Sequence, residues 1–109
     1  MLNENFFIPA TVEERPITLD DGTVHVLHFR HLDVATFELF AMQTASRDDT
    51  VASHAAARLV VAGLCTPDGK PALKLEDAIR IKRPVFRRIF DALLDVNSYG
   101  KKAADEGNL

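Results

Sequence analysis

The amino-acid sequence predicts a mainly α-helical domain of about four helices with a short N-terminal β-hairpin. The chain has 109 residues, which suits one domain with one ordinary core. Apolar residues recur at helical spacing through most of residues 33–97, whereas residues 11–30 combine β-branched residues with a tight-turn signal. We therefore expect a single domain over residues 1–97, with the hairpin at about 11–30, helices at about 33–97 and a disordered tail at 98–109.

The hairpin is predicted from two extended segments and the turn between them. Residues 11–19 suit an edge strand, because Pro16 lacks the N–H that a central strand needs. The sequence Asp20-Asp21-Gly22 is a tight-turn signal, and residues 23–30 then form the second strand. A two-stranded hairpin is marginal alone, so we expect it to dock on the helices that follow.

Two helices are predicted next. Asp33 is an N-cap residue type for a helix that runs through Gln43, and the apolar arc of that helix is wide for a surface helix. Residues 46–49 resemble a capping box, so the second helix is expected at about 50–64. Its three consecutive alanines would let a neighbouring helix approach closely, and the turn-rich residues 66–71 follow it.

Two more helical segments complete the domain. Residues 75–83 are predicted as a short helix with acidic residues near its start, where they suit the helix dipole. Pro84 breaks this helix and can serve as the first residue of the last one, which residues 97–100 close. The buried stripe of the last helix is predicted to contain Val85, Ile89, Leu93 and Val96. On its wet side Arg87 and Asp91 are spaced to pair across one turn.

Composition and motifs argue against an enzyme. The sequence has no GxGxxG, P-loop, GxSxG or HExxH motif. His25, His28 and His31 are three apart, but a strand places His28 on the opposite face from the other two. The single cysteine, Cys65, excludes an internal disulfide and a Cys-rich zinc site, and we expect it to pack as a small hydrophobe. We expect no catalytic residue, no cofactor and no metal.

The sequence also argues against a membrane protein. Its longest apolar run is residues 59–65, which is far short of the ~20 residues that a membrane span needs. Residues 1–5 lack the features of a secretory signal. We therefore expect a cytoplasmic protein.

Charge is divided unevenly along the chain. The net charge is −3, with −6 on residues 1–49 and +3 on residues 50–109, so there is no global attraction to nucleic acid. The basic excess is densest over residues 80–88, where Pro84 would interrupt a recognition helix, which disfavours a DNA-binding regulator. Two interpretations stay open: a solvated helix face, or an acidic half of one copy that meets the basic half of the next.

Apolar surface is the remaining signal. The chain has seven phenylalanines, a wide apolar helix and an apolar N-terminal arm that ends in Phe6-Phe7-Ile8-Pro9. The arm would cover the core, cover a sheet edge or contact another subunit. Apolar area beyond the need of one small core indicates self-association or a protein partner, and the alternative is that all of it is core.

Two segments resemble the tail assembly chaperones of long-tailed, lambda-like siphophages. In that family an apolar helix leads into a D-G-K/R-P-like loop, as residues 59–73 do here. A final helix then ends in a pattern like L-F-D-A-x-L-x-x-N, which residues 89–97 match with the sequence I-F-D-A-L-L-D-V-N. The likeness covers roughly residues 17–97.

The resemblance implies a non-catalytic assembly factor of the host cytoplasm. Such chaperones bind the tape measure protein, a long apolar helical rod, and are absent from the mature virion. In this family a frameshifted longer form recruits the tail tube protein, and Gly100-Lys101-Lys102 is compatible with a slippery codon run. The alternative is a structural virion component, such as a head–tail connector or a tail-terminator-like subunit.

We expect partner binding at apolar side chains and at a basic cluster, and we expect the chain to form a homo-oligomer. The candidate partner-binding residues are Phe37, Phe40, Met42, Arg83, Phe86, Arg87 and Arg88.

Overall fold

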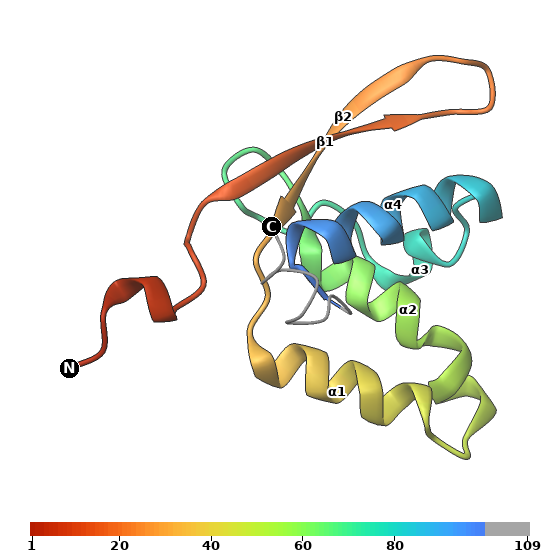
Figure 1. Ribbon diagram of the computed structural model, residues 1–109. Coiled ribbons are helices and arrows are strands. Elements are labelled where there is room, and N and C mark those ends of the chain that lie inside the picture. The colour runs from red at the N-terminus through yellow and green to blue at the C-terminus, as the bar shows by residue number, and fades with distance from the viewer. Residues whose placement is uncertain (100–109) are drawn as a thin grey trace, which may run out of the picture.

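The computed structural model describes residues 1–99 and has an α+β fold (Figure 1). The elements in chain order are η1 (Glu4–Phe6), β1 (Val12–Thr18), β2 (Val24–Arg30), α1 (Val34–Thr44), α2 (Asp49–Gly63), β3 (Leu64–Cys65), α3 (Leu75–Ala78) and α4 (Arg83–Val96). The hairpin and the four helices expected from the sequence are present within these residues. The sheet, however, has three antiparallel strands in the order β1-β2-β3.

The hairpin forms as the turn signal predicts. Strands β1 and β2 pair from Val12 with Arg30 to Thr18 with Val24. Gly22 has a φ of +86°, a conformation that glycine adopts without strain, and the Leu19 N–H donates to the Thr23 carbonyl at 2.8 Å. Strand β1 lies at the edge of the sheet, as Pro16 requires.

The sequence analysis missed strand β3. Leu64 pairs with Phe29 and Cys65 pairs with His28, where we had expected the end of a helix. Two residues are too few to show the alternation that indicates a strand. Both side chains are buried, so the prediction that Cys65 packs as a small hydrophobe is confirmed, and burial raises the pKa of its thiol.

Two helix boundaries differ from the prediction. Helix α2 begins at Asp49 because the Asp48 carboxylate accepts from the Thr50 N–H at 2.9 Å, so Asp48 is the N-cap and residues 46–49 form no capping box. Helix α3 has four residues rather than nine. Lys82 takes an extended conformation with ψ 136° as the chain turns into α4, so a helix cannot run through it.

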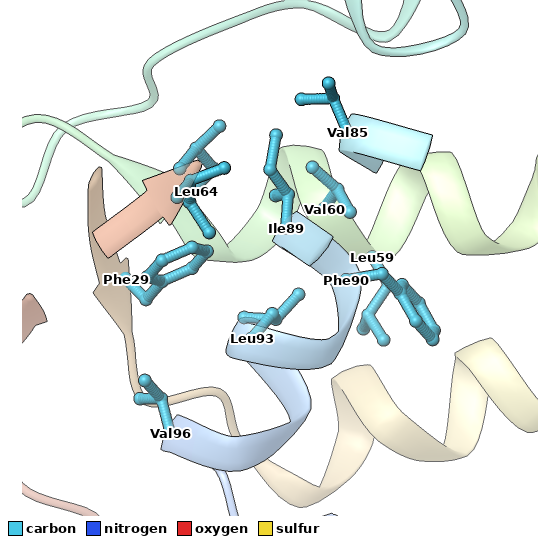
Figure 2. Close-up of a cluster of buried hydrophobic side chains, with 10 residues drawn as sticks. Phe29, Leu59, Val60, Leu64, Val85, Ile89, Phe90, Leu93 and Val96 are labelled. Atoms are coloured by element: carbon cyan, nitrogen blue, oxygen red, sulfur yellow. The ribbon is translucent and has the colours of Figure 1, made fainter. Parts of the chain in front are cut away.

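The core lies where α4 packs between the sheet and α2. Figure 2 shows Phe29 and Leu64 of the sheet and Val60 of α2 close to Ile89 and Leu93 of α4. The predicted stripe of α4 is confirmed, since all four of its residues are buried. No helix within residues 1–99 is long and apolar enough to cross a membrane.

Helix α1 lies at the periphery of this core. None of its residues is fully buried. Phe37 stacks on Tyr99 with ring centroids 4.6 Å apart, and Phe40 meets Phe90 at 6.0 Å. Tyr99 was expected in a disordered tail, but this stacking gives it a defined place. Residues 100–109 of that expected tail lie outside the described residues.

Asn97 joins three elements at the end of α4. Its side-chain oxygen accepts from the Leu32 N–H at 2.7 Å, just before α1. Its side-chain nitrogen donates to the Arg30 carbonyl at 3.2 Å and to the Leu93 carbonyl at 3.0 Å. One amide group therefore fixes the end of β2 and the entry to α1 against the end of α4.

We expect Asn97→Ala to lower the free energy of unfolding by about 2 kcal/mol, because partly buried backbone groups at Arg30 and Leu32 lose their partner. Urea denaturation measures the change. The same change at the exposed Asn5, Asn5→Ala, should stay within about 0.5 kcal/mol of the parent chain. Equal stabilities for the two variants would contradict the role of Asn97.

We expect Gly63→Ala to destabilise the chain by about 1–3 kcal/mol, because a Cβ at position 63 would overlap the Cδ1 atom of buried Leu93. The control places the same change in a Leu93→Ala background, which removes the obstructing atom. A cost of Gly63→Ala that is equally large in both backgrounds would show that the close approach to Leu93 is not its cause.

Candidate protein-binding surfaces

The titratable groups of the hairpin form separate pairs rather than a site. His28 Nε2 lies 3.4 Å from Glu14 Oε1, and His31 Nε2 lies 3.2 Å from Glu13 Oε2. The hydrogen bond from His31 is the main cause that lowers the pKa of Glu13. Within residues 1–99 no group of three or more His, Cys, Asp or Glu side chains could hold a metal ion.

The seven predicted partner-binding residues do not form one surface. Phe37 and Phe40 are half-buried and turn toward Tyr99 and Phe90, so they position α1 on the body of the protein. Met42 lies elsewhere on α1 and is exposed. The remaining four residues are on α4, where Arg83, Phe86 and Arg87 line one groove and Arg88 lies apart from them.

The outward face of α1 is the first candidate binding surface. It presents Val34 and Met42 with exposed fractions of 77% and 70%, whereas Leu39 lines a hollow between α1 and α2. Glu38, the only charged residue of α1, lies on the same outward face. The predicted binding residues include Met42 but not Val34. The wide apolar arc of this helix was the sequence signal that could have identified the face. A helix whose inward side carries Phe37 and Phe40 needs no apolar residues on its other side.

The second candidate surface is a groove between α2, α3 and the start of α4, with a volume of about 670 Å³. Its apolar lining comes from Ala56, Ala57, Ala78, Ile79, Ile81 and Phe86. The alanine run of α2 leaves this space, since small side chains face the larger Phe86. Ser53, His54, Arg83 and Arg87 supply the polar part of the lining.

The two arginines make this groove electropositive. Arg87 Nε lies 3.9 Å from Asp91 on the next turn, as the spacing predicted, and both side chains are exposed. Arg83 makes no ion pair within residues 1–99. An apolar groove with unneutralised positive charge suits an apolar segment that carries an acidic residue.

Arg88 serves the fold instead. Its Nη1 donates to the Thr18 carbonyl at 2.7 Å and to Asp20 Oδ1 at 3.3 Å, which fastens the tip of the hairpin to α4. Arg15 Nε and Asp95 Oδ2, 3.3 Å apart, make a second link between hairpin and helix. The predicted cluster of Arg83, Arg87 and Arg88 is therefore divided between two sides of α4.

The N-terminal arm, residues 1–10, is the third feature of the surface. All ten residues are exposed, and Phe6 and Phe7 keep 72% and 62% of their surface. The arm adds no strand to the sheet and buries no side chain in the core. Within residues 1–99 the arm therefore covers neither the core nor an edge of the sheet.

Comparisons of the chain with protein-family models, with curated proteins and with solved structures gave no match.

We expect Arg88→Ala to lower the free energy of unfolding by about 1 kcal/mol and to speed amide exchange at the hairpin turn, because a charged donor leaves the Thr18 carbonyl. Arg87→Ala is the matched control, and should cost less than about 0.5 kcal/mol because its ion pair is exposed. Denaturation and hydrogen exchange make the comparison. A larger effect from Arg87 than from Arg88 would reverse the assignment.

Proposed function

We propose that the chain is a tail assembly chaperone of a lambda-like siphophage, which binds the tape measure protein and keeps it soluble without catalysis. Besides the resemblance, one observation carries the proposal: the outward face of α1 is apolar and exposed. A helix that is apolar on both sides is normally buried, so α1 needs a partner to cover it.

The chemistry of this face suits an apolar helical rod. Val34 and Met42 offer apolar contact area, and Glu38 is the one charged side chain of α1 that such a contact would desolvate. The two apolar side chains are already about a quarter buried, so covering the rest would contribute roughly 2–4 kcal/mol. Association itself costs about 4–15 kcal/mol, so one copy binds weakly. Many copies along one rod, linked to each other, gain affinity through avidity.

The proposal places the protein in the host cytoplasm during tail assembly. A fraction of translation events would shift frame at Gly100-Lys101-Lys102 and add a domain that recruits the tail tube protein. This position follows the last core residue, Val96, and the Asn97 contacts, so both products would keep the same fold. Codons for residues 100–102 without a repetitive heptamer would contradict this part of the proposal.

The direct test is co-expression of the chain with the tape measure protein of the same genome, followed by affinity capture and light scattering. A soluble complex with many copies per rod is the expected result. An insoluble rod, with this chain eluting alone, would overturn the proposal.

We expect Val34→Lys with Met42→Lys to reduce capture of the tape measure protein at least tenfold, because two charges would enter an apolar contact. The matched control is Val24→Lys with Val26→Lys, which changes two exposed apolar residues of the hairpin in the same way. Wild-type capture by the α1 variant would contradict the assignment of this face.

The alternative function, a structural virion component, makes the opposite prediction for mature particles. Mass spectrometry of purified virions distinguishes the two. A chaperone should be missing from them, whereas a connector or terminator subunit should persist in fixed copy number.

A further inference from the structure

The arm and the groove between α2, α3 and α4 are not used by the proposed contact of α1. We propose that the N-terminal arm of one copy of this chain occupies that groove on a second copy. The inference goes beyond the proposed function, because it concerns association of the chain with itself.

The arm buries no side chain in the core of its own chain and leaves its apolar side chains free for a binding site. Leu2, Phe6, Phe7 and Ile8 are all more than half exposed, so four large apolar side chains stand together without a cover. The short turn η1 presents them, and the Asn3 side chain caps it by accepting from the Asn5 N–H at 2.8 Å. A preformed apolar segment loses less conformational entropy on binding than a random one.

The arm cannot reach the groove of its own chain. Figure 1 shows the arm leaving the body on the side away from α3 and the start of α4, which form the groove. Ile8 lies four residues before Val12, where the sheet begins, so the two Cα atoms are at most about 14 Å apart. Ile8 is therefore held near the start of β1, on the side of the body away from the groove (Figure 1). An arm that fills the groove comes from another copy.

The groove matches the arm in chemistry and size. Its apolar lining suits aromatic rings, and its volume of about 670 Å³ is within the range of ligand-binding clefts. The arm contains one charged side chain, Glu4, and neither Glu4 nor Arg83 has an ion-pair partner within residues 1–99. Glu4 of one copy therefore meets the positive charge of Arg83 and Arg87 on the next.

This contact joins copies head to tail. Every chain offers one arm and one groove on different sides, so each copy both gives and receives, which forms a ring if the rotation closes and an open filament if it does not. Two phenylalanines bury about 300–500 Å² of the arm's surface. This is less than the ~800 Å² that each partner of a stable pair buries, so single contacts are weak and association rises with concentration.

Two variants of the full chain separate donor from acceptor. Phe6→Ser with Phe7→Ser removes the arm contact but leaves the groove. Ile79→Asp with Arg83→Glu places two negative charges in the groove and leaves the arm unchanged. Both residues are exposed, so the domain should stay folded. Val24→Ser with Val26→Ser is the matched control, because it removes exposed apolar surface from the hairpin.

Sedimentation velocity over a concentration series is the first measurement. The parent chain and the hairpin control should show an average mass that rises several-fold above the 12.1 kDa monomer. The arm and groove variants should each stay at 12.1 kDa. A parent chain that stays monomeric at millimolar concentration, or an arm variant that associates like the parent, would overturn the proposal.

Mixing the two variants is the decisive experiment. The arm of the groove variant should fill the groove of the arm variant, so a one-to-one mixture should form dimers and nothing larger. Absence of dimers in that mixture would refute head-to-tail exchange. Arg83→Glu alone should prevent association, and Glu4→Arg on the same chain should restore it. This pair repeats the test with a single changed residue in the groove.

The failure of one proposal can be told from the failure of the other. Loss of self-association in the arm variant, with capture of the tape measure protein weakened to the level of single copies because avidity is lost, supports the groove contact and leaves the α1 contact intact. If the tape measure protein is not bound but mixed variants still form dimers, the proposed function is wrong and the arm contact stands.

Discussion

The entry to α1 is held to the end of α4 by the hydrogen bonds of the Asn97 side chain. α1 contributes no fully buried residue, so apolar burial alone does not fix its position. The Asn97 side chain holds the backbone at Leu32, one residue before the α1 cap, to the end of α4. With its entry fixed, α1 turns Phe37 and Phe40 toward the body, and its other side is left with apolar residues and no cover.

Local signals in the sequence were sufficient for most elements but not for their connections. The Asp-Gly turn, the Asp33 cap and the stripe from Val85 to Val96 depend on neighbours in sequence, and these predictions are confirmed. Strand β3 depends on pairing with β2, about 35 residues earlier, and the partners of Asn97 at Arg30 and Leu32 are more than 60 residues away. No local pattern encodes such contacts.

The same distinction explains the candidate sites. Helical spacing placed Arg83, Arg87 and Arg88 close together, but whether an arginine faces a groove or the hairpin depends on what packs against each side of α4. The exposed face of α1 and the arm–groove pair use different parts of the surface. If both proposals hold, one copy contacts an apolar rod and its neighbouring copies at the same time.

The late position of α4 has a consequence for synthesis on the ribosome. Chains emerge from their N-terminus at roughly 5–20 residues per second. Ile17, Phe29, Leu59 and Val60 emerge long before the stripe of α4 that covers them, so a nascent chain exposes half of its core until Val96 leaves the exit tunnel. The core of this domain therefore forms in one late step of synthesis. The nascent chains on one polysome expose incomplete cores close to one another.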